Sequence, residues 1–292
     1  MKFLQARFIS CFLLLFIVAF YQPLEAQTVV TWNLQWYPGR TSEKPKAEDE
    51  QKQIQASQSA LKKLNPDIFI AQEMRDWQAF KDLVSVVPGL QVHVVSAFRD
   101  PATGAVAKQQ IGIASKLKVF SAWSEAWKPV LPQLPRGYAF AALKNPADDS
   151  LLMVYGLHLK SNRGSTKDVL KQDACLRDES IKQLLVHMNA MQKVFKGHKI
   201  KGWISAGDHN TGQDGRFTDS VVATMEKAGF WNSWKETPEA QRLTWRGNRF
   251  AKLAPTTFDY IFLKGLGKPK ALMIEESVDT SDHWPVMVNL SP

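Results

Sequence analysis

The chain has 292 residues, 45% of them hydrophobic and 22% charged, and a formal net charge of +9 at pH 7. This length is enough to bury a large hydrophobic core, and the basic balance suggests an anionic partner such as nucleic acid, phospholipid headgroups or a cell surface. The sequence has two cysteines, and Cys11 lies in the N-terminal stretch that we expect to be removed. One remaining cysteine, Cys175, can form neither an internal disulfide nor a metal site made of several thiolates.

The first 26 residues have the pattern of a secretory signal peptide. Lys2 and Arg7 form a basic start, residues 8–20 are almost entirely apolar, and Ala26 offers a small residue at a cleavage point. The apolar run is shorter than the roughly 20 residues of a membrane span, and an uncleaved anchor is the alternative. We expect residues 1–26 to be removed and residues 27–292 to form one secreted or periplasmic domain, with no later transmembrane segment.

The elements expected in chain order alternate between short apolar strands and amphipathic helices. Strands are predicted over residues 28–34, 67–73, 90–97, 109–115, 119–127, 137–143, 151–159, 200–208, 257–263, 271–275 and 285–290. A turn follows the first strand at residues 35–39, and helices are predicted over residues 47–64, 77–86, 166–195 and 218–227. Cys175 is expected to be buried in the third helix. This order predicts an α+β layered sandwich with two β-sheets face to face and helices outside.

Polar residues with metal or phosphate chemistry stand at or near the ends of several predicted strands. They are Asn33, Glu73, His158, Asp208, Asn210, Asp259, Asp282 and His283. Most have a structural explanation when taken singly: a turn cap, a solvated carboxylate, a core histidine, or an Asx-turn. Asp259 is harder to explain, because apolar residues flank it and a buried carboxylate is costly without a partner. His283 is the natural partner, and a carboxylate-paired imidazole is a positioned acid or base.

The side-chain types in this set point to a hard metal ion. Carboxylate and amide oxygens suit Mg²⁺, Mn²⁺ or Ca²⁺ rather than zinc, and Mg²⁺ typically needs only one or two protein carboxylates. Two histidines beside such an ion fit phosphoester hydrolysis, in which a carboxylate orients water and imidazoles stabilise charge or protonate the leaving oxygen. A His-His-carboxylate zinc site is the competitor, but no HExxH spacing supports it.

Six short motifs, in order, resemble those of the endonuclease/exonuclease/phosphatase superfamily, the fold of pancreatic-type deoxyribonuclease. They are Trp32-Asn33-Leu34, Gln72-Glu73, Gly156-Leu157-His158-Leu159-Lys160, Gly207-Asp208-His209-Asn210, Asp259-Tyr260-Ile261 and Ser281-Asp282-His283-Trp284-Pro285-Val286. The resemblance covers essentially the whole mature chain. It implies a four-layer α/β/β/α sandwich, with two mostly antiparallel sheets packed face to face and outer helices.

The resemblance also implies a metal site for Mg²⁺, or for Mn²⁺ or Ca²⁺. Glu73 would be the main metal ligand, and Asn33 and Asp282 would lie at or near the metal. We expect no obligate protein partner, and a monomer.

Catalytic roles follow from the same resemblance. Asp208 would orient or deprotonate the nucleophilic water, and Asn210 would bind a phosphoryl oxygen. His283 would be the general acid/base or transition-state stabiliser, oriented by Asp259. His158 would be the second imidazole. A histidine in that strand is similar to the deoxyribonuclease and sphingomyelinase branches, whereas abasic-site nucleases have a tyrosine.

The chain departs from the family pattern at His209, where the family usually has a large apolar residue or Phe. We expect its side chain to point away from the site and to have a structural role. The disulfide of secreted deoxyribonuclease is absent, so close kinship with that enzyme is not supported.

Substrate is less well defined. Lys160, Asn162 and Arg163 follow the His158 strand, where they can hold a flanking phosphate. A second cluster interleaves basic and aromatic residues in a way that suits nucleic acid: Arg242, Trp245, Arg246 and Arg249. For each cluster a solvated loop or core packing is the structural alternative. The leading hypothesis is an endonuclease with DNA or RNA as substrate. The alternatives are a phosphatase or sphingomyelinase-like phospholipase on lipid or sugar phosphates, and a non-catalytic binding protein of the same fold.

Overall fold

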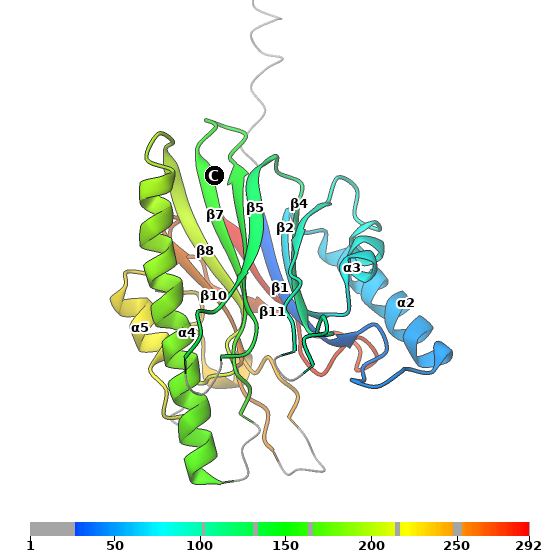
Figure 1. Ribbon diagram of the computed structural model, residues 1–292. Coiled ribbons are helices and arrows are strands. Elements are labelled where there is room, and N and C mark those ends of the chain that lie inside the picture. Colours follow the sequence, from blue (N-terminus) through cyan, green and yellow to red (C-terminus); the bar gives the residue numbers. More distant parts are fainter. Residues whose placement is uncertain are drawn as a thin grey trace, which may run out of the picture.

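The computed structural model describes residues 27–100, 103–130, 134–162, 166–213, 217–247 and 253–291. The expected signal peptide, Arg163 and Arg249 lie outside these ranges. Two six-stranded sheets pack face to face, with helices on both outer faces (Figure 1). The four-layer sandwich expected from the sequence is therefore confirmed.

The first sheet has the strand order β11-β12-β1-β2-β4-β3. Its strands are β1 (Gln27–Tyr37), β2 (Ile68–Met74), β3 (Gln91–Val95), β4 (Gln110–Ser115), β11 (Leu272–Met273) and β12 (Val286–Leu290). Only β1 and β2 are parallel among the described pairs of this sheet.

The second sheet has the order β5-β6-β7-β8-β10-β9. Its strands are β5 (Val119–Ala126), β6 (Gly137–Lys144), β7 (Leu151–His158), β8 (Ile200–Asp208), β9 (Trp231–Asn232) and β10 (Asp259–Lys264). Here β7 and β8 are parallel, and the other described pairs are antiparallel.

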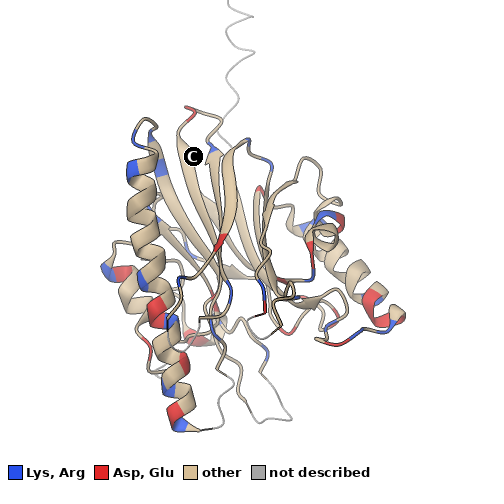
Figure 2. Ribbon diagram, in the orientation of Figure 1, with Lys and Arg blue, Asp and Glu red and all other residues tan. Residues whose placement is uncertain are grey.

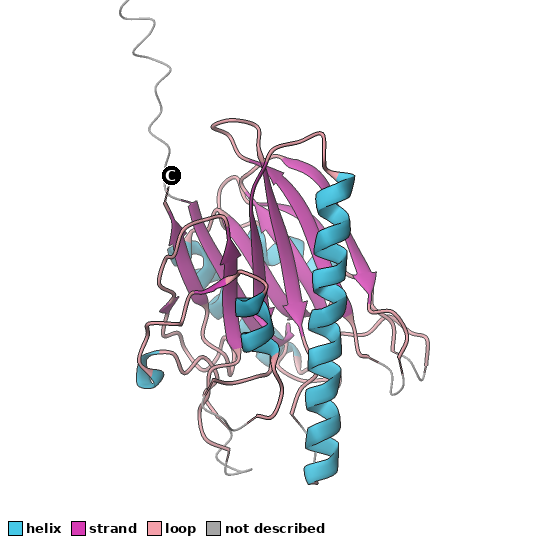
Figure 3. Ribbon diagram, turned by 90° about the vertical axis from the view of Figure 1, so that its left-hand side faces the viewer, coloured by secondary structure: helices cyan, strands magenta, loops and turns pink. Residues whose placement is uncertain are grey.

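Four α-helices cover the outer faces. Helices α2 (Ala47–Leu64) and α3 (Trp77–Val84) lie on the first sheet, and α4 (Lys167–Val194) and α5 (Val221–Lys227) lie on the second (Figures 1 and 3). A short 3₁₀ helix spans Glu239–Gln241. Thr166 caps α4 by accepting a hydrogen bond from Val169 N. Charged residues gather on these helices and on the connecting loops, whereas the strands are mostly uncharged (Figure 2).

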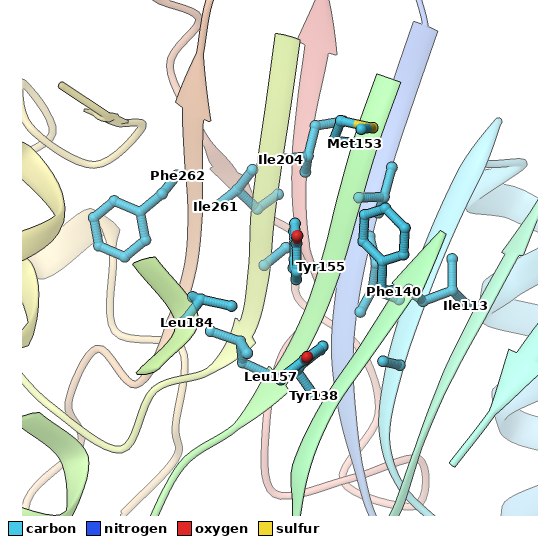
Figure 4. Packing of buried hydrophobic residues seen from close by; sticks show 14 of the residues in the cluster. Ile113, Tyr138, Phe140, Met153, Tyr155, Leu157, Leu184, Ile204, Ile261 and Phe262 are labelled. Atoms are coloured by element: carbon cyan, nitrogen blue, oxygen red, sulfur yellow. The ribbon is translucent and has the colours of Figure 1, made fainter. Parts of the chain in front are cut away.

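The core follows from strands that are apolar on both faces. Every residue of β2 and of β7 is buried. Ile70 packs into the inter-sheet cluster, whereas its neighbour Phe69 packs towards α2 and α3. Figure 4 shows the larger cluster around Tyr155 and Phe140. The sheets approach closely at Gly156, where a Cβ would meet Ile111 Cγ2 at 2.8 Å, so a side chain there would force them apart.

Strand direction brings the polar strand ends to one end of the sandwich. The parallel pairs β1–β2 and β7–β8 place four carboxyl ends there, and the antiparallel strands β10 and β12 begin at the same end. In register, Asp208 is paired with both His158 and Asp259. This end lies opposite the C-terminus, at the bottom of Figure 1.

Two local expectations were wrong, and one short strand was not predicted. The predicted turn at residues 35–39 begins inside β1, which continues to Tyr37 with Gln35 and Trp36 at positive φ. Cys175 is exposed rather than buried, because it lies on the outer face of α4 between the buried residues Ala174 and Leu176. Strand β9 lies in the stretch 230–250, for which no element was predicted. Among the described helices, none has the length and apolar character needed to span a membrane.

Candidate active site

Three side chains converge on one carboxylate oxygen, Oδ2 of Asp208. Asn33 Nδ2 donates to it at 2.9 Å, and Nε2 of His158 and of His283 lie 3.6 and 3.9 Å away. Each of the four residues comes from a different strand or strand end, and each is buried. Gly207 permits this approach: it has a φ of +146°, and a Cβ there would lie 2.0 Å from Leu157 O. Asp208 is therefore the geometric centre of the predicted site.

Glu73 stands beside this centre on the neighbouring sheet. Its Oε1 accepts a hydrogen bond from Asn33 Nδ2 at 3.2 Å and lies 3.7 Å from His158 Nε2, while Oε2 accepts from Trp36 N at 3.0 Å. The backbone of Glu73 has a φ of +60°, at an irregularity in the pairing of β2 with β4. A left-handed conformation at a non-glycine residue costs free energy and is common at functional sites.

His283 is held by a buried carboxylate. Its Nδ1 lies 2.7 Å from Oδ2 of Asp259, which has no exposed surface. The backbone of His283 is fixed as well, because His283 N donates to Ser281 Oγ and His283 O accepts from Trp32 Nε1. Thr244 Oγ1 accepts a hydrogen bond from Asp259 N. The imidazole therefore presents Nε2 to Asp208 in one fixed orientation.

The charges of these groups depend on one another. Burial acts to lower the pKa of His283, but the surrounding carboxylates of Asp259, Asp208 and Asp282 outweigh it and raise that pKa. Burial raises the pKa of Asp208, with a further contribution from Asp259 and an opposing one from His283. Both groups are therefore protonated more readily in the folded protein than as free side chains.

The side chains present fit a magnesium-type ion. Glu73 and Asp282 supply carboxylates, and Mg²⁺ is usually held by one or two of these together with water and phosphate oxygens. Asp282 is oriented by Trp245, whose Nε1 donates to its Oδ2 at 3.1 Å. Asn33 turns its amide nitrogen towards Glu73, because its Oδ1 accepts from Gln35 N. Among the described residues, no group of three or more His, Cys, Asp or Glu is placed to hold a metal ion.

The residues predicted to bind phosphate differ in position. Asn162 reaches the site, where its Nδ2 donates to Asn210 O at 2.5 Å. Lys160 instead pairs with Asp173 of α4, with Nζ and Oδ1 2.8 Å apart. Arg163 lies outside the described residues. Asn210 N donates to Asp208 Oδ1, and Asn210 Nδ2 donates to Leu159 O, so the Asx-turn considered from the sequence is present and fixes both residues.

His209, the first residue after β8, points away from the site. Its ring is completely buried and packs edge-on against Tyr260 and Phe262. Nδ1 donates to Gly207 O at 2.9 Å, and Nε2 has no hydrogen-bond partner among the described residues. Burial lowers the pKa of His209 to about 4, so the ring is neutral at pH 7 and acts in packing.

Two arginines support the site in ways that the sequence did not predict. Arg136 donates to His158 O and Leu159 O and so fixes the end of β7. Arg246, which had been considered for nucleic-acid contact, stacks over Trp284 and donates to Ser281 O. The mixture of basic and aromatic residues around Arg246 predicted a surface role, whereas in the fold Arg246 supports the C-terminal loop. Nothing in the sequence around Arg136 indicated its role.

Comparisons with known proteins place the fold. No family model and no curated protein matches the sequence. In structure, the chain is similar to an endonuclease/exonuclease/phosphatase family protein from Bacteroides thetaiotaomicron, with a TM-score of 0.66, 20% identity, and coverage of 91% of this chain and 94% of that one. It is also similar to a mannosyl-6-phosphatase from the same species, with a TM-score of 0.64, 18% identity, and coverage of 91% of this chain and 100% of that one. A third similar structure is sphingomyelinase C from Streptomyces griseocarneus, with a TM-score of 0.66, 15% identity, and coverage of 91% of this chain and 99% of that one.

Proposed function

From the endonuclease/exonuclease/phosphatase fold of this chain, we propose that it is an exported, divalent-metal-dependent phosphodiesterase, specifically an endonuclease on DNA or RNA. One observation carries the proposal: two buried imidazoles, His158 and His283, converge on the buried carboxylate of Asp208 beside Glu73. Carboxylates and imidazoles so arranged can move a proton to or from water and stabilise a phosphoryl group.

The proposed reaction assigns a step to each group. Asp208 orients the attacking water and accepts its proton as the new oxygen–phosphorus bond forms. His283, held in place by Asp259, and His158 stabilise charge on the phosphoryl oxygens or protonate the leaving oxygen. Glu73 and Asp282, with Asn33 nearby, would hold the metal ion. When bound, the ion polarises the phosphoryl oxygens and offsets their negative charge.

The net charge of +9 supports a polyanionic substrate, and the signal-peptide pattern of residues 1–26 supports export. The structural similarity to a mannosyl-6-phosphatase and to a sphingomyelinase C favours the alternative, a phosphatase or phospholipase on sugar or lipid phosphates. A non-catalytic binding protein is disfavoured, since the sequence contains all the motif residues.

A panel of substrates separates these functions. Purified protein is incubated with supercoiled plasmid, RNA, sphingomyelin vesicles and a small phosphomonoester, each with Mg²⁺ and with EDTA. We expect Mg²⁺-dependent nicking of the plasmid or cleavage of the RNA. Activity on the lipid or the monoester alone would overturn the nuclease assignment, and inactivity on all four would contradict a phosphoesterase.

A further inference from the structure

A basic cleft adjoins the predicted site at the junction of β1 and α2. Its volume is about 570 Å³. The charged residues that line it are Arg40, Lys44, Lys46, Lys52, Asp49 and Asp279. Four cations and two carboxylates leave a net charge of +4 − 2 = +2. The cleft is therefore suited to an anion.

The walls of the cleft are held by a buried side chain. Gln53, 1% exposed, accepts from Gly39 N through Oε1 and donates through Nε2 to Leu34 O and Thr280 O. These bonds join the end of β1, the connecting loop and the C-terminal loop. Gly39 has a φ of +112°, and a Cβ there would lie 2.4 Å from Pro45 Cβ, so the loop is closely packed and the cleft is preformed.

Hydrogen bonds connect the cleft to the site. Arg40 Nε donates to Gln35 Oε1 at 2.8 Å, and the same oxygen accepts from Asp282 N at 3.2 Å. Gln35 N in turn donates to Asn33 Oδ1. Arg40 is thus one side chain away from two residues predicted to lie at the metal.

The positive charge of the cleft is not explained by local stability. Lys52 pairs with Asp279 at 2.9 Å, which leaves Arg40, Lys44 and Lys46 against the single carboxylate of Asp49. Lys46 is the N-cap residue of α2, and its side chain makes no capping hydrogen bond. A cation at a helix N-terminus opposes the helix dipole. All three residues are exposed, so their charges are available to a ligand.

We propose that this cleft binds a phosphate of a polynucleotide strand whose scissile phosphate lies at Asp208. The substrate is then an extended nucleic acid rather than a small phosphomonoester, and cleavage is favoured where neighbouring phosphates are present. This inference rests on the proposed phosphodiesterase function. It adds to that function a second contact, which fixes the register of the strand.

The test measures binding and turnover in one set of variants. A labelled single-stranded oligonucleotide is titrated, in EDTA, with the parent, Lys44→Ala/Lys46→Ala, and the control Lys62→Ala/Lys63→Ala at the other end of α2. We expect the cleft variant to bind roughly tenfold more weakly at low salt, with the slope of log K against log salt reduced by about 0.7 for each cation removed. The control should keep the parent's slope. Lys44→Arg/Lys46→Arg should keep it too, which separates loss of charge from loss of folding.

Turnover distinguishes the two proposals. In Mg²⁺, kcat/KM of the cleft variant should fall about tenfold more on the oligonucleotide than on bis(p-nitrophenyl) phosphate, which has one phosphate, with the difference mainly in KM. If Lys44→Ala/Lys46→Ala keeps the parent's salt dependence of binding and the parent's ratio of kcat/KM on the two substrates, the cleft assignment is wrong. The proposed phosphodiesterase function is then unaffected. A parent whose binding depends on Lys44 and Lys46, but which cleaves neither substrate, contradicts the proposed function and supports the cleft.

Discussion

Nδ1 of His283 lies 2.7 Å from Oδ2 of Asp259, and this carboxylate has no exposed surface. A buried carboxylate without a compensating partner would cost several kcal/mol or take up a proton. The imidazole is therefore both the partner that stabilises Asp259 and the group that Asp259 orients. Each residue depends on the other, although 24 positions separate them in the sequence.

Replacing Asp259 with Asn should reduce kcat on bis(p-nitrophenyl) phosphate about 100-fold, because the amide can no longer fix the imidazole in its proton-donating state. Asp259 is a positioning residue, so its effect should require His283. The double variant Asp259→Asn/His283→Ala should be no slower than His283→Ala alone. Losses that multiply in the double variant would show that Asp259 acts by another route.

The bond from Trp245 Nε1 to Asp282 Oδ2 orients a predicted metal ligand. Loss of such a supporting hydrogen bond typically weakens metal binding about 10- to 100-fold. Trp245→Phe should therefore bind Mn²⁺ at least about tenfold more weakly by isothermal titration calorimetry. Trp77→Phe, at a side chain that is 50% exposed on α3, is the matched control. Equal affinities in the two variants would remove Asp282 from the metal site.

A buried ion pair anchors α4 to the loop after β8. The side chains of Arg177 and Asp219 are each 1% exposed, with Nη2 and Oδ2 2.7 Å apart. Removing one partner leaves an uncompensated buried charge, so Asp219→Asn should lower the free energy of unfolding by about 3 kcal/mol in urea titrations. Glu226→Gln, which breaks the exposed pair with Lys235, should cost less than about 1 kcal/mol. Similar losses in both variants would contradict the anchoring role.

His209 makes stability depend on acid pH. Its pKa is about 4 in the folded protein and about 6.5 in an unfolded chain. The unfolded state binds more protons between these values, so stability falls as pH drops from 6.5 through 4. The loss attributable to His209 approaches about 3 kcal/mol below pH 4. Between pH 7 and pH 4, the free energy of unfolding measured in urea should therefore fall by about 3 kcal/mol less in His209→Phe than in the parent. Parallel pH profiles for parent and variant would mean that His209 does not titrate in this way.

Much of the fold follows from local pattern. Helix α2 occupies the predicted residues 47–64, because the apolar face ends where Asn65 and Pro66 stop the helix. The pairing of Asp259 with His283 was expected for a physical reason: an acid inside an apolar strand requires a partner. Residues at strand ends are brought together by strand direction alone, which is why a list of strand-end residues predicted the cluster around Asp208.

Contacts that depend on side-chain direction could not be predicted in this way. Lys160 follows the His158 strand, but Asp173 on α4 draws its ammonium group aside. Asn33 turns its nitrogen to the carboxylates because Gln35 N binds its oxygen, and this contact depends on the positive φ of Gln35. Cys175 was placed on the wrong face of α4 since a small residue beside buried neighbours gives no periodic signal.

In the proposed reaction, Asp208 activates water for a metal-dependent cleavage of phosphodiester bonds. The most direct measurement is the rate of supercoiled plasmid nicking by the parent and by Asp208→Asn, in Mg²⁺ and in EDTA, with the exposed Asp149→Asn as control. We expect nicking by the parent and the control in Mg²⁺ only, and a loss of at least about 100-fold in Asp208→Asn. An Asp208→Asn protein that nicks at the parent's rate, or nicking that persists in EDTA, would contradict the claim.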